Sequence, residues 1–177
     1  MTKGLEQLWA GWRSEYVVAA TDAERHDAEP GGECIFCRIV RSGPPSLENG
    51  VVWRGDQSLV VLNLYPYASG HLLVVPLRHA EALGELTYEE SADMWSAART
   101  AVAAITDAFH PDGINLGANL GRAAGAGIPR HLHLHVVPRW SGDTNFMTSV
   151  AGVRVLPQPL SETWEKLQAV WPVPLGS

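Results

Sequence analysis

Three histidines alternate with apolar residues late in the chain, in the run His131-Leu132-His133-Leu134-His135-Val136-Val137. Successive side chains of an extended strand point to opposite faces, so the histidines share one face and the apolar residues take the other. The apolar face explains the strand, whereas a row of imidazoles has no packing explanation because its burial costs desolvation. The run therefore predicts a chemical site, with a solvated polar face or a tag-like metal patch as the plainer alternative.

Clustered imidazoles on a strand suit two kinds of chemistry. All three histidines could bind zinc, as in hydrolases with three histidine ligands. Alternatively, one imidazole could attack phosphorus while its neighbours hold the phosphate oxygens. A fourth histidine, His71, follows Ser69-Gly70 and opens another apolar run, from which it could approach the same phosphate. This additional histidine favours attack on phosphorus.

The chain has 2 cysteines, and they stand together in Cys34-Ile35-Phe36-Cys37. Two residues between thiols is the spacing of metal ligands or of a redox dithiol, and a disulfide that closed so short a loop would stabilise little. No strand–helix–strand pattern of the thioredoxin kind surrounds the pair, which favours a metal. A closed tetrahedral site then requires two further ligands.

The surrounding sequence predicts an α+β fold with a mainly antiparallel sheet, because strands precede and follow one long helix. Thr87 and Glu90 form a capping-box pattern at the start of that helix, which we expect to end near His110. Further elements are expected as strands over 50–54, 58–64, 71–76, 114–120, 131–137 and 153–156, and as a last helix over 161–171.

The first residues predict a helical arm outside this body. Leu5, Leu8, Trp9 and Trp12 share one helical face, and a polar stretch with Pro30-Gly31-Gly32 follows. The aromatic face requires a partner, which is either the body or a second subunit. We therefore expect an arm and linker over 1–33, a main domain over 34–146 and a C-terminal extension over 147–177.

Composition narrows the possible partners. The 177 residues carry a net charge of −6, which argues against a protein that coats nucleic acid or a membrane surface but permits a small anionic ligand. The first residues lack the basic and apolar stretches of a signal peptide, and no apolar run approaches the ~20 residues of a membrane span. We expect a cytoplasmic protein without a nucleic-acid or membrane partner.

The histidine run resembles the signature of the histidine triad (HIT) superfamily, in which three histidines alternate with apolar residues. Other landmarks occur in the same order, namely Leu62-Asn63, the segment 70–76, the long helix, Asn119 before a glycine-rich loop, and Val137-Pro138-Arg139. The resemblance covers about residues 34–146. It implies a HIT-like fold, with the arm and the C-terminal helix as additions, and a homodimer or a higher homo-oligomer.

The resemblance also implies roles. His133 would attack the α-phosphate of a nucleotide to form a nucleotidyl-imidazole, while His135 and His71 hold non-bridging oxygens. The nucleotide-binding positions implied are Asn63, Asn119, Gly125, Ala126, Gly127, His131 and Trp140. Trp140 could equally be a core residue. The chain departs from the family at Gly127-Ile128-Pro129-Arg130, where many members carry Gln or Ser before the first histidine.

Zinc-bearing HIT proteins carry a similar Cys-Ile-Phe-Cys segment. They complete a zinc site with a histidine after the Gly-His strand and with the first histidine of the triad. The resemblance therefore implies structural Zn²⁺ bound by Cys34, Cys37, His79 and His131. By itself, His79 is typical of a surface histidine at a strand end.

Segments 62–67 and 138–147 are similar to the bacterial diadenosine tetraphosphate phosphorylases of the superfamily. That similarity implies an enzyme that cleaves a phosphoanhydride of a dinucleoside polyphosphate, with phosphate or water as the acceptor. A purine nucleoside phosphoramidate hydrolase and a slow-turnover nucleotide sensor are the alternatives. A hydrolase that uses all three triad histidines as zinc ligands remains a third class.

Overall fold

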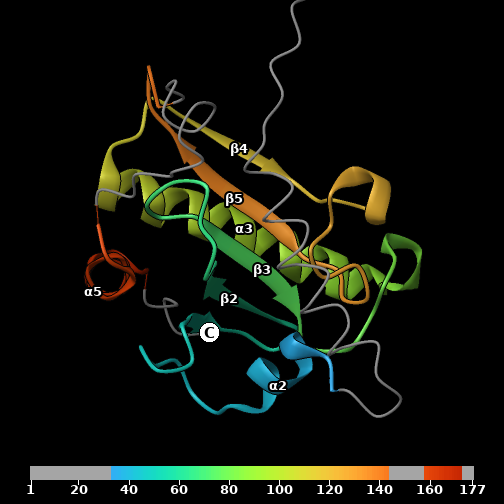
Figure 1. Ribbon diagram of the computed structural model, residues 1–177. Helices are drawn as coiled ribbons and strands as arrows, with labels where there is room; N and C mark the ends of the chain where they lie inside the picture. The colour runs from blue at the N-terminus through green and yellow to red at the C-terminus, as the bar shows by residue number, and fades with distance from the viewer. Residues whose placement is uncertain (1–32, 144–157, 173–177) are drawn as a thin grey trace, which may run out of the picture.

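The computed structural model describes residues 33–143 and 158–172 (Figure 1). The expected arm over 1–33 falls, apart from Glu33, outside the described residues, and so does the expected strand over 153–156. The described elements, in chain order, are α2 (Ile35–Arg41), β1 (Val51–Arg54), β2 (Ser58–Leu62), β3 (Leu72–Pro76), η1 (Leu83–Glu85), α3 (Tyr88–Phe109), β4 (Gly113–Gly117), η2 (Arg122–Ala124), β5 (Leu134–Arg139) and α5 (Leu160–Val170).

The strands form one antiparallel sheet in the order β1-β2-β3-β5-β4. β3 and β5 are distant in sequence but adjacent in the sheet, and Leu73 pairs with His135. This register brings His71, which precedes β3, next to His135 in β5. The expected α+β fold is confirmed.

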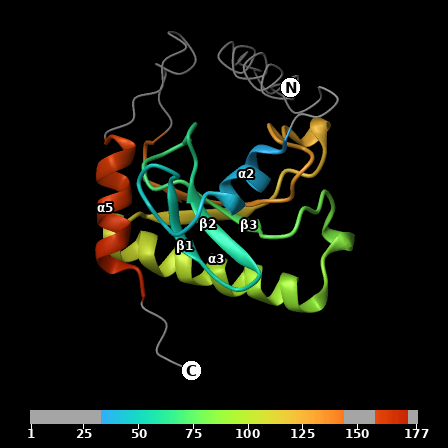
Figure 2. The same ribbon diagram turned by 90° about the horizontal axis from the view of Figure 1, so that it is seen from below.

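The two faces of the sheet carry different helices (Figure 2). α3 packs on one face, where Leu72, Val74, Leu134 and Val136 enter the larger core cluster. The short α2 lies on the other face, where Phe36 packs with the alternate strand residues. Because side chains alternate along a strand, the histidines lie on the face that α2 covers. The sequence analysis assigned no helix to residues 35–41, since one of only seven residues is too short to show periodicity.

The long helix matches its predicted ends. Thr87 accepts a hydrogen bond from the Glu90 backbone N–H, and the Glu90 side chain accepts one from the Thr87 backbone N–H, so the capping box is confirmed. The helix ends at Phe109, and His110 takes the left-handed conformation at φ 47°.

The strand that carries the triad begins later than expected. β5 starts at Leu134, so the prediction that it starts at His131 is wrong. The Leu132 N–H donates to the carbonyl of Ala80, and the His131 carbonyl accepts from the His133 ring. These two backbone groups therefore bond outside the sheet, and the strand pairing begins only at Leu134. β4 likewise ends at Gly117, three residues before the expected end.

The C-terminal helix α5 closes one edge of the sheet. Trp164 Nε1 and Gln168 Nε2 donate to the carbonyls of Val51 and Val52, at 3.1 and 2.6 Å. Leu167 is fully buried in the same core as α3. Side chains of α5 thus satisfy carbonyls on the outer edge of β1. The division of the chain at residue 147 stays a prediction.

Candidate catalytic and metal-binding site

Three histidines meet on the face of the sheet that α2 covers. His71 and His133 are buried and His135 is half-buried. The ring centroids of His133 and His135 are 5.0 Å apart, and those of His71 and His135 are 5.2 Å apart. The three predicted catalytic residues are therefore neighbours, brought together by the pairing of β3 with β5.

His133 has a fixed tautomer. Its Nδ1 lies 2.8 Å from the carbonyl oxygen of His131, and a carbonyl can only accept, so Nδ1 carries the hydrogen. Nε2 then holds the lone pair. Burial lowers the pKa of His133 below its usual value, and the Phe36 ring packs 5.1 Å from the imidazole. The ring is neutral near pH 7 and therefore nucleophilic.

His135 is also neutral near pH 7. Burial, and to a smaller extent electrostatic repulsion from His133 when both rings are protonated, lowers the pKa of His135 from 6.5 to about 4. Its Nδ1 lies 3.0 Å from His71 Nε2, and the Asn119 amide nitrogen lies 3.4 Å from its Nε2. A neutral imidazole stabilises a phosphate oxygen by donating a hydrogen bond, so in this environment His135 could hold a non-bridging oxygen as a neutral donor and not as a cation.

Asn63 lies between β2 and His71. Its Nδ2 is 3.3 Å from His71 Nδ1, and its Oδ1 accepts the backbone N–H of Tyr65 at 2.9 Å. These contacts hold the amide beside the histidines. The predicted contact of Asn63 with a nucleotide stays a prediction.

The glycine-rich loop joins β4 to the triad segment. Gly125 has φ 85°, a conformation that suits glycine, while Ala126 is buried and Gly127 is half-buried. Ile128 packs against the cluster that contains Phe36. The loop therefore returns to the α2 face just before His131, as a phosphate-binding role requires.

Trp140 lies away from the three histidines. His135 pairs with Gly117 at one end of the β4–β5 ladder, whereas Arg139 pairs with Gly113 at the other. At about 3.3 Å per residue, Trp140 follows His135 by roughly 16 Å along the strand. Within the described part of one chain, the structure does not bring Trp140 to the histidines, and its nucleotide contact stays a prediction.

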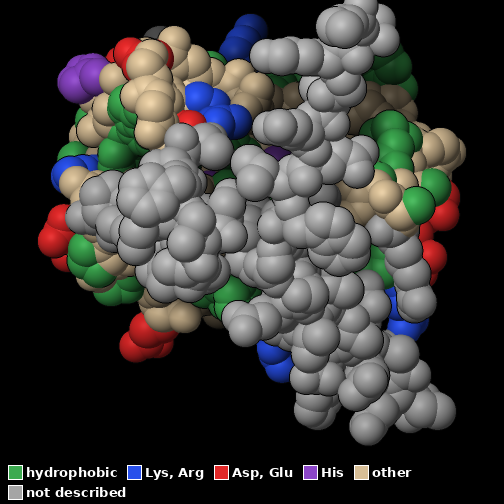
Figure 3. Space-filling model, turned by 45° about the horizontal axis from the view of Figure 1, so that its top comes forward, with side chains coloured by type: hydrophobic (Ala, Val, Ile, Leu, Met, Phe, Trp, Pro, Cys, Tyr) green, Lys and Arg blue, Asp and Glu red, His purple; other side chains and the backbone are tan. Residues whose placement is uncertain are grey.

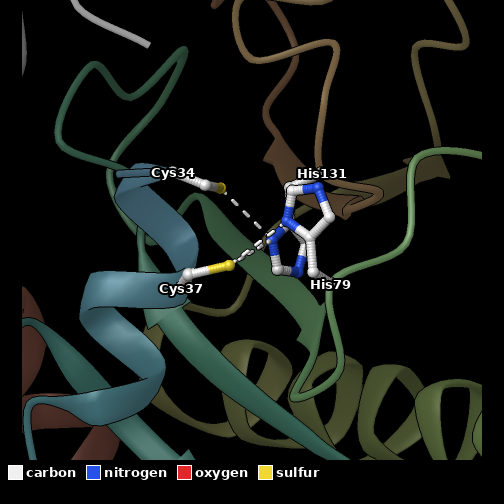
Figure 4. A group of neighbouring side chains, drawn as sticks. All are labelled: Cys34, Cys37, His79 and His131. Carbon is white, nitrogen blue, oxygen red and sulfur yellow. Dashed lines mark hydrogen bonds between the residues drawn. The ribbon is translucent and has the colours of Figure 1, made fainter. Parts of the chain in front are cut away.

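The four predicted metal ligands form a second cluster, and their side chains point toward one another (Figure 4). One ligand atom from each of Cys34, Cys37, His79 and His131 lies within 4.8 Å of all the others. His131 Nδ1 is 3.4 and 3.7 Å from the two sulfurs, and His79 Nδ1 is 3.2 Å from Cys37 Sγ. Ligands of a tetrahedral zinc ion lie about 3.3–3.8 Å apart, so this donor set fits Zn²⁺.

The outer nitrogens of both histidines in this cluster face acceptors. His131 Nε2 lies 3.1 Å from the Pro76 carbonyl, and His79 Nε2 lies 3.9 Å from a Glu81 carboxylate oxygen. Such partners orient a metal-binding imidazole and keep the lone pair on the inner nitrogen. Burial lowers the pKa of His131 from 6.5 to about 4, so its Nδ1 is unprotonated at neutral pH.

Two residues that the sequence analysis did not single out contact these histidines. Phe36 stands between the two thiols and packs on His131 and His133, with centroids 5.5 and 5.1 Å away. Tyr67 packs on His71 and His135, at 4.9 and 6.1 Å. An aromatic residue inside a Cys-x-x-Cys segment, and another three residues before Gly70, were the available signals.

The surface drawn in Figure 3 carries Lys, Arg, Asp and Glu side chains in scattered positions around its rim. No broad patch of one sign is visible among its described residues. Across 33–143 and 158–172, no helix has the length and apolar character needed to cross a membrane.

Residues 45–142 match the model of the HIT domain family. The chain belongs to that family. It is 40% identical to an AP-4-A phosphorylase of Mycobacterium tuberculosis over 167 residues, which cover 94% of this chain and 85% of the relative. The family resemblance is confirmed, and the protein is a HIT enzyme.

Two further relatives bear on the site. An adenosine 5'-monophosphoramidase of Schizosaccharomyces pombe is 33% identical over 106 residues, which cover 60% of this chain and 74% of that one. The crystal structure of a Zn-bound histidine triad family protein from Mycobacterium smegmatis superposes with a TM-score of 0.63 at 32% identity, covering 77% of this chain and 91% of that one.

Proposed function

We propose that the enzyme cleaves a phosphoanhydride of a dinucleoside polyphosphate through a nucleotidyl-histidine on His133. The observation that carries the proposal is the 2.8 Å hydrogen bond from His133 Nδ1 to the His131 carbonyl. It fixes the tautomer with the lone pair on Nε2, and burial keeps the ring neutral. A neutral, oriented imidazole is what attack on phosphorus requires.

In the first step, His133 Nε2 attacks the α-phosphorus. The P–N bond forms while the bond from phosphorus to the bridging oxygen breaks, and the leaving polyphosphate departs with that electron pair. His135, as a neutral donor, stabilises the charge that develops on the phosphate, with Asn119 3.4 Å from its Nε2. In the second step, an oxygen of inorganic phosphate or water attacks phosphorus, and the pair of the P–N bond returns to Nε2.

Inorganic phosphate is the acceptor that we propose. The 40% identity to an AP-4-A phosphorylase supports phosphorolysis. The segment before the first histidine, which departs from the family pattern, lies in a loop with Gly125 at φ 85° and half-buried Gly127. We assign the contacts to the incoming phosphate to backbone N–H groups of this loop, because no Gln or Ser side chain is present there.

Product analysis tests the acceptor. With diadenosine tetraphosphate as substrate, ATP and ADP should form only when inorganic phosphate is added. ATP with AMP at equal rates with and without phosphate would establish hydrolysis instead. Rapid quenching with labelled substrate should place the label on His133, and an unlabelled protein under conditions of full turnover would refute the covalent mechanism.

A nucleoside phosphoramidate hydrolase is the second candidate, because the Schizosaccharomyces pombe relative is named as an adenosine 5'-monophosphoramidase. The same attack by His133 would serve, with an amine as the leaving group. Comparing kcat/KM for adenosine 5'-phosphoramidate and diadenosine tetraphosphate separates the two functions. Cleavage of neither substrate, with retained binding of adenine nucleotides, would favour the slow-turnover sensor.

We also propose that Cys34, Cys37, His79 and His131 bind structural zinc. Two thiolates and two imidazole Nδ1 atoms at tetrahedral spacing support this assignment. Bound zinc supplies a rigid cross-link between α2, the segment after β3 and the triad segment. Thiols stay reduced in the cytoplasm and are available there to bind zinc, which supports the cytoplasm as the site of action that we propose.

A second copy of the chain is the partner that we propose besides the nucleotide. β4 is an edge strand that pairs with β5 on one side, and four of its five residues are exposed. One of these four is Leu116, at 40% exposure, and Leu120, three residues beyond the strand, is 49% exposed. An accessible edge strand with apolar neighbours is suited to pairing with another strand, so a homodimer or a higher assembly is expected. The mass in solution tests it.

A further inference from the structure

The turn between β2 and β3 holds an aromatic residue against two of the proposed catalytic histidines. The Tyr67 ring lies 4.9 Å from the His71 ring and 6.1 Å from the His135 ring, with an interplanar angle of 25° to the latter. Tyr67 is 39% exposed, whereas His71 is 1% exposed. The tyrosine ring thus lies on the solvent side of the histidine pair.

The backbone of Tyr67 contacts the same pair. Its N–H donates to His71 Nδ1 at 3.0 Å. An N–H can only donate, so Nδ1 must accept and carries no hydrogen. In neutral His71 the hydrogen is then on Nε2, which lies 3.0 Å from His135 Nδ1. That hydrogen is donated to His135 Nδ1, so the hydrogen of neutral His135 is on Nε2, and the Asn119 side chain, 3.4 Å from that nitrogen, must turn its amide oxygen toward it to accept.

We propose that Tyr67 is a positioning residue that fixes the tautomers of His71 and His135, so that His135 presents an Nε2–H donor to the substrate phosphate. The backbone N–H sets the direction of the hydrogen bonds, and the ring keeps water from competing with the bond between the histidines. The inference rests on the proposed function for its kinetic consequence, but its structural content holds for the enzyme without substrate.

The surrounding turn keeps this N–H in place. The His71 N–H donates to the Ala68 carbonyl at 3.2 Å, and the Asn63 N–H donates to the His71 carbonyl at 3.1 Å. Asn63 Nδ2 lies 3.3 Å from His71 Nδ1 and 3.4 Å from His71 Nε2, so it does not distinguish the two ring nitrogens, and the Tyr67 N–H is the contact that selects between them. The direction of the relay from His71 to His135 is therefore built into the turn.

Nitrogen-15 NMR of the full-length, ¹⁵N-histidine-labelled protein tests the structural part directly. His71 and His135 should each show a protonated Nε2 and an unprotonated Nδ1, while His133 should show the opposite pattern. A hydrogen on Nδ1 of His71 or His135 in the wild type would overturn the proposal, whatever the activity.

Three variants separate the ring from the backbone N–H. Tyr67→Phe retains both and should keep kcat within about twofold of wild type. Tyr67→Ala loses the ring and should lower kcat several-fold. Tyr67→Pro also loses the N–H and should lower kcat by about 10–100-fold with KM within about threefold. This is less than the roughly 10²–10³-fold cost of removing a donor outright, because His135 stays in place and loses only its preference for one tautomer. The histidine ¹⁵N pattern should become mixed only in Tyr67→Pro.

Different outcomes would refute the role of Tyr67 and the proposed function. An unchanged ¹⁵N pattern and an unchanged kcat in a folded Tyr67→Pro protein would overturn the role of Tyr67. If Tyr67→Pro does not fold, the wild-type ¹⁵N spectrum and the ratio of kcat between Tyr67→Ala and Tyr67→Phe decide the matter, and a ratio near one would refute the role of the ring. Absence of any nucleotidyl-histidine in the wild type would refute the proposed function alone.

Discussion

Two histidines separated by a single residue, His131 and His133, use opposite ring nitrogens. The outer Nε2 of His131 faces the Pro76 carbonyl at 3.1 Å and leaves Nδ1 toward the thiols. Nδ1 of His133 faces the His131 carbonyl at 2.8 Å and leaves Nε2 for chemistry. A backbone carbonyl thus selects the tautomer in both cases, and the nitrogen that it leaves determines whether the ring suits a metal or a phosphate.

The two centres are also joined. The carbonyl that orients His133 belongs to His131, whose ring faces Cys34 and Cys37. Phe36, between those cysteines, packs on both imidazoles. The metal cluster therefore supports the nucleophile from its backbone and from its ring face, although no thiol contributes to the proposed reaction.

The largest expected effect is the loss of the nucleophile. His133→Ala should lower kcat by on the order of 10⁴-fold or more, because a covalent nucleophile has no substitute in the site. His135→Ala and His71→Ala should be impaired but measurable, since each removes one stabilising contact. Steady-state kinetics with diadenosine tetraphosphate measures these effects. The exposed His110 provides the control variant His110→Asn, and near-normal turnover by His133→Ala would end the assignment.

The second effect tests the other centre. The wild type should hold about one zinc per chain, and Cys34→Ala should lose it. If zinc is present at about 100–1,000 times its Kd, it contributes ~2.7–4.1 kcal/mol, so Tm should fall by roughly 5–16 °C. Because the His131 carbonyl shifts as well, kcat should fall with the zinc content. Metal analysis and thermal unfolding measure this, with Arg38→Ala on the same helix as control. Metal-free protein of unchanged Tm would contradict the zinc proposal.

The third effect concerns pH. The pKa of His135 is lowered to about 4 in the folded protein, so between about pH 6.5 and 4 the unfolded chain binds the additional proton. Stability should therefore be complete above pH 6.5 and fall as the pH drops, by about 1–3 kcal/mol for this group. Urea unfolding at pH 7 and pH 5 should show a smaller loss for His135→Gln than for wild type or His110→Asn. Equal losses in all three would contradict the neutral burial of His135.

The smallest expected effect concerns the metal cluster alone. Glu81 lies 3.9 Å from His79 Nε2 and is exposed, as is Arg130, which lies 3.8 Å from the same carboxylate. Glu81→Gln should weaken zinc binding by only about two- to fivefold, below the 10–100-fold typical of buried partners. At saturating zinc, kcat should not change. Competition with a chromogenic chelator measures the affinity, and a loss of kcat at full zinc occupancy would show that the centres are coupled through His79.

Several elements could be predicted because their signals are local. The capping box of Thr87 and Glu90 and the apolar stripe after it specify α3 within a few residues. Short apolar runs indicated β2 and β3, and histidines that alternate with apolar residues indicated β5, but the expected ends of β4 and β5 were wrong. Those ends depend on backbone hydrogen bonds to remote groups, such as the bond from the Leu132 N–H to Ala80, and periodicity carries no information about them.

The sequence by itself determined the imidazole and thiol chemistry. Through the family resemblance, it also indicated which residues would form the catalytic and metal-binding sites. Only the tertiary structure decided how they are used. The pairing of β3 with β5 brings His71 within hydrogen-bond distance of His135, and the docking of α2 brings Cys34 to His131, 97 positions away. Which nitrogen of each ring is the donor follows from the carbonyl or N–H beside it. Residue type fixes what an imidazole can do, but its tautomer is set by neighbours that only folding supplies.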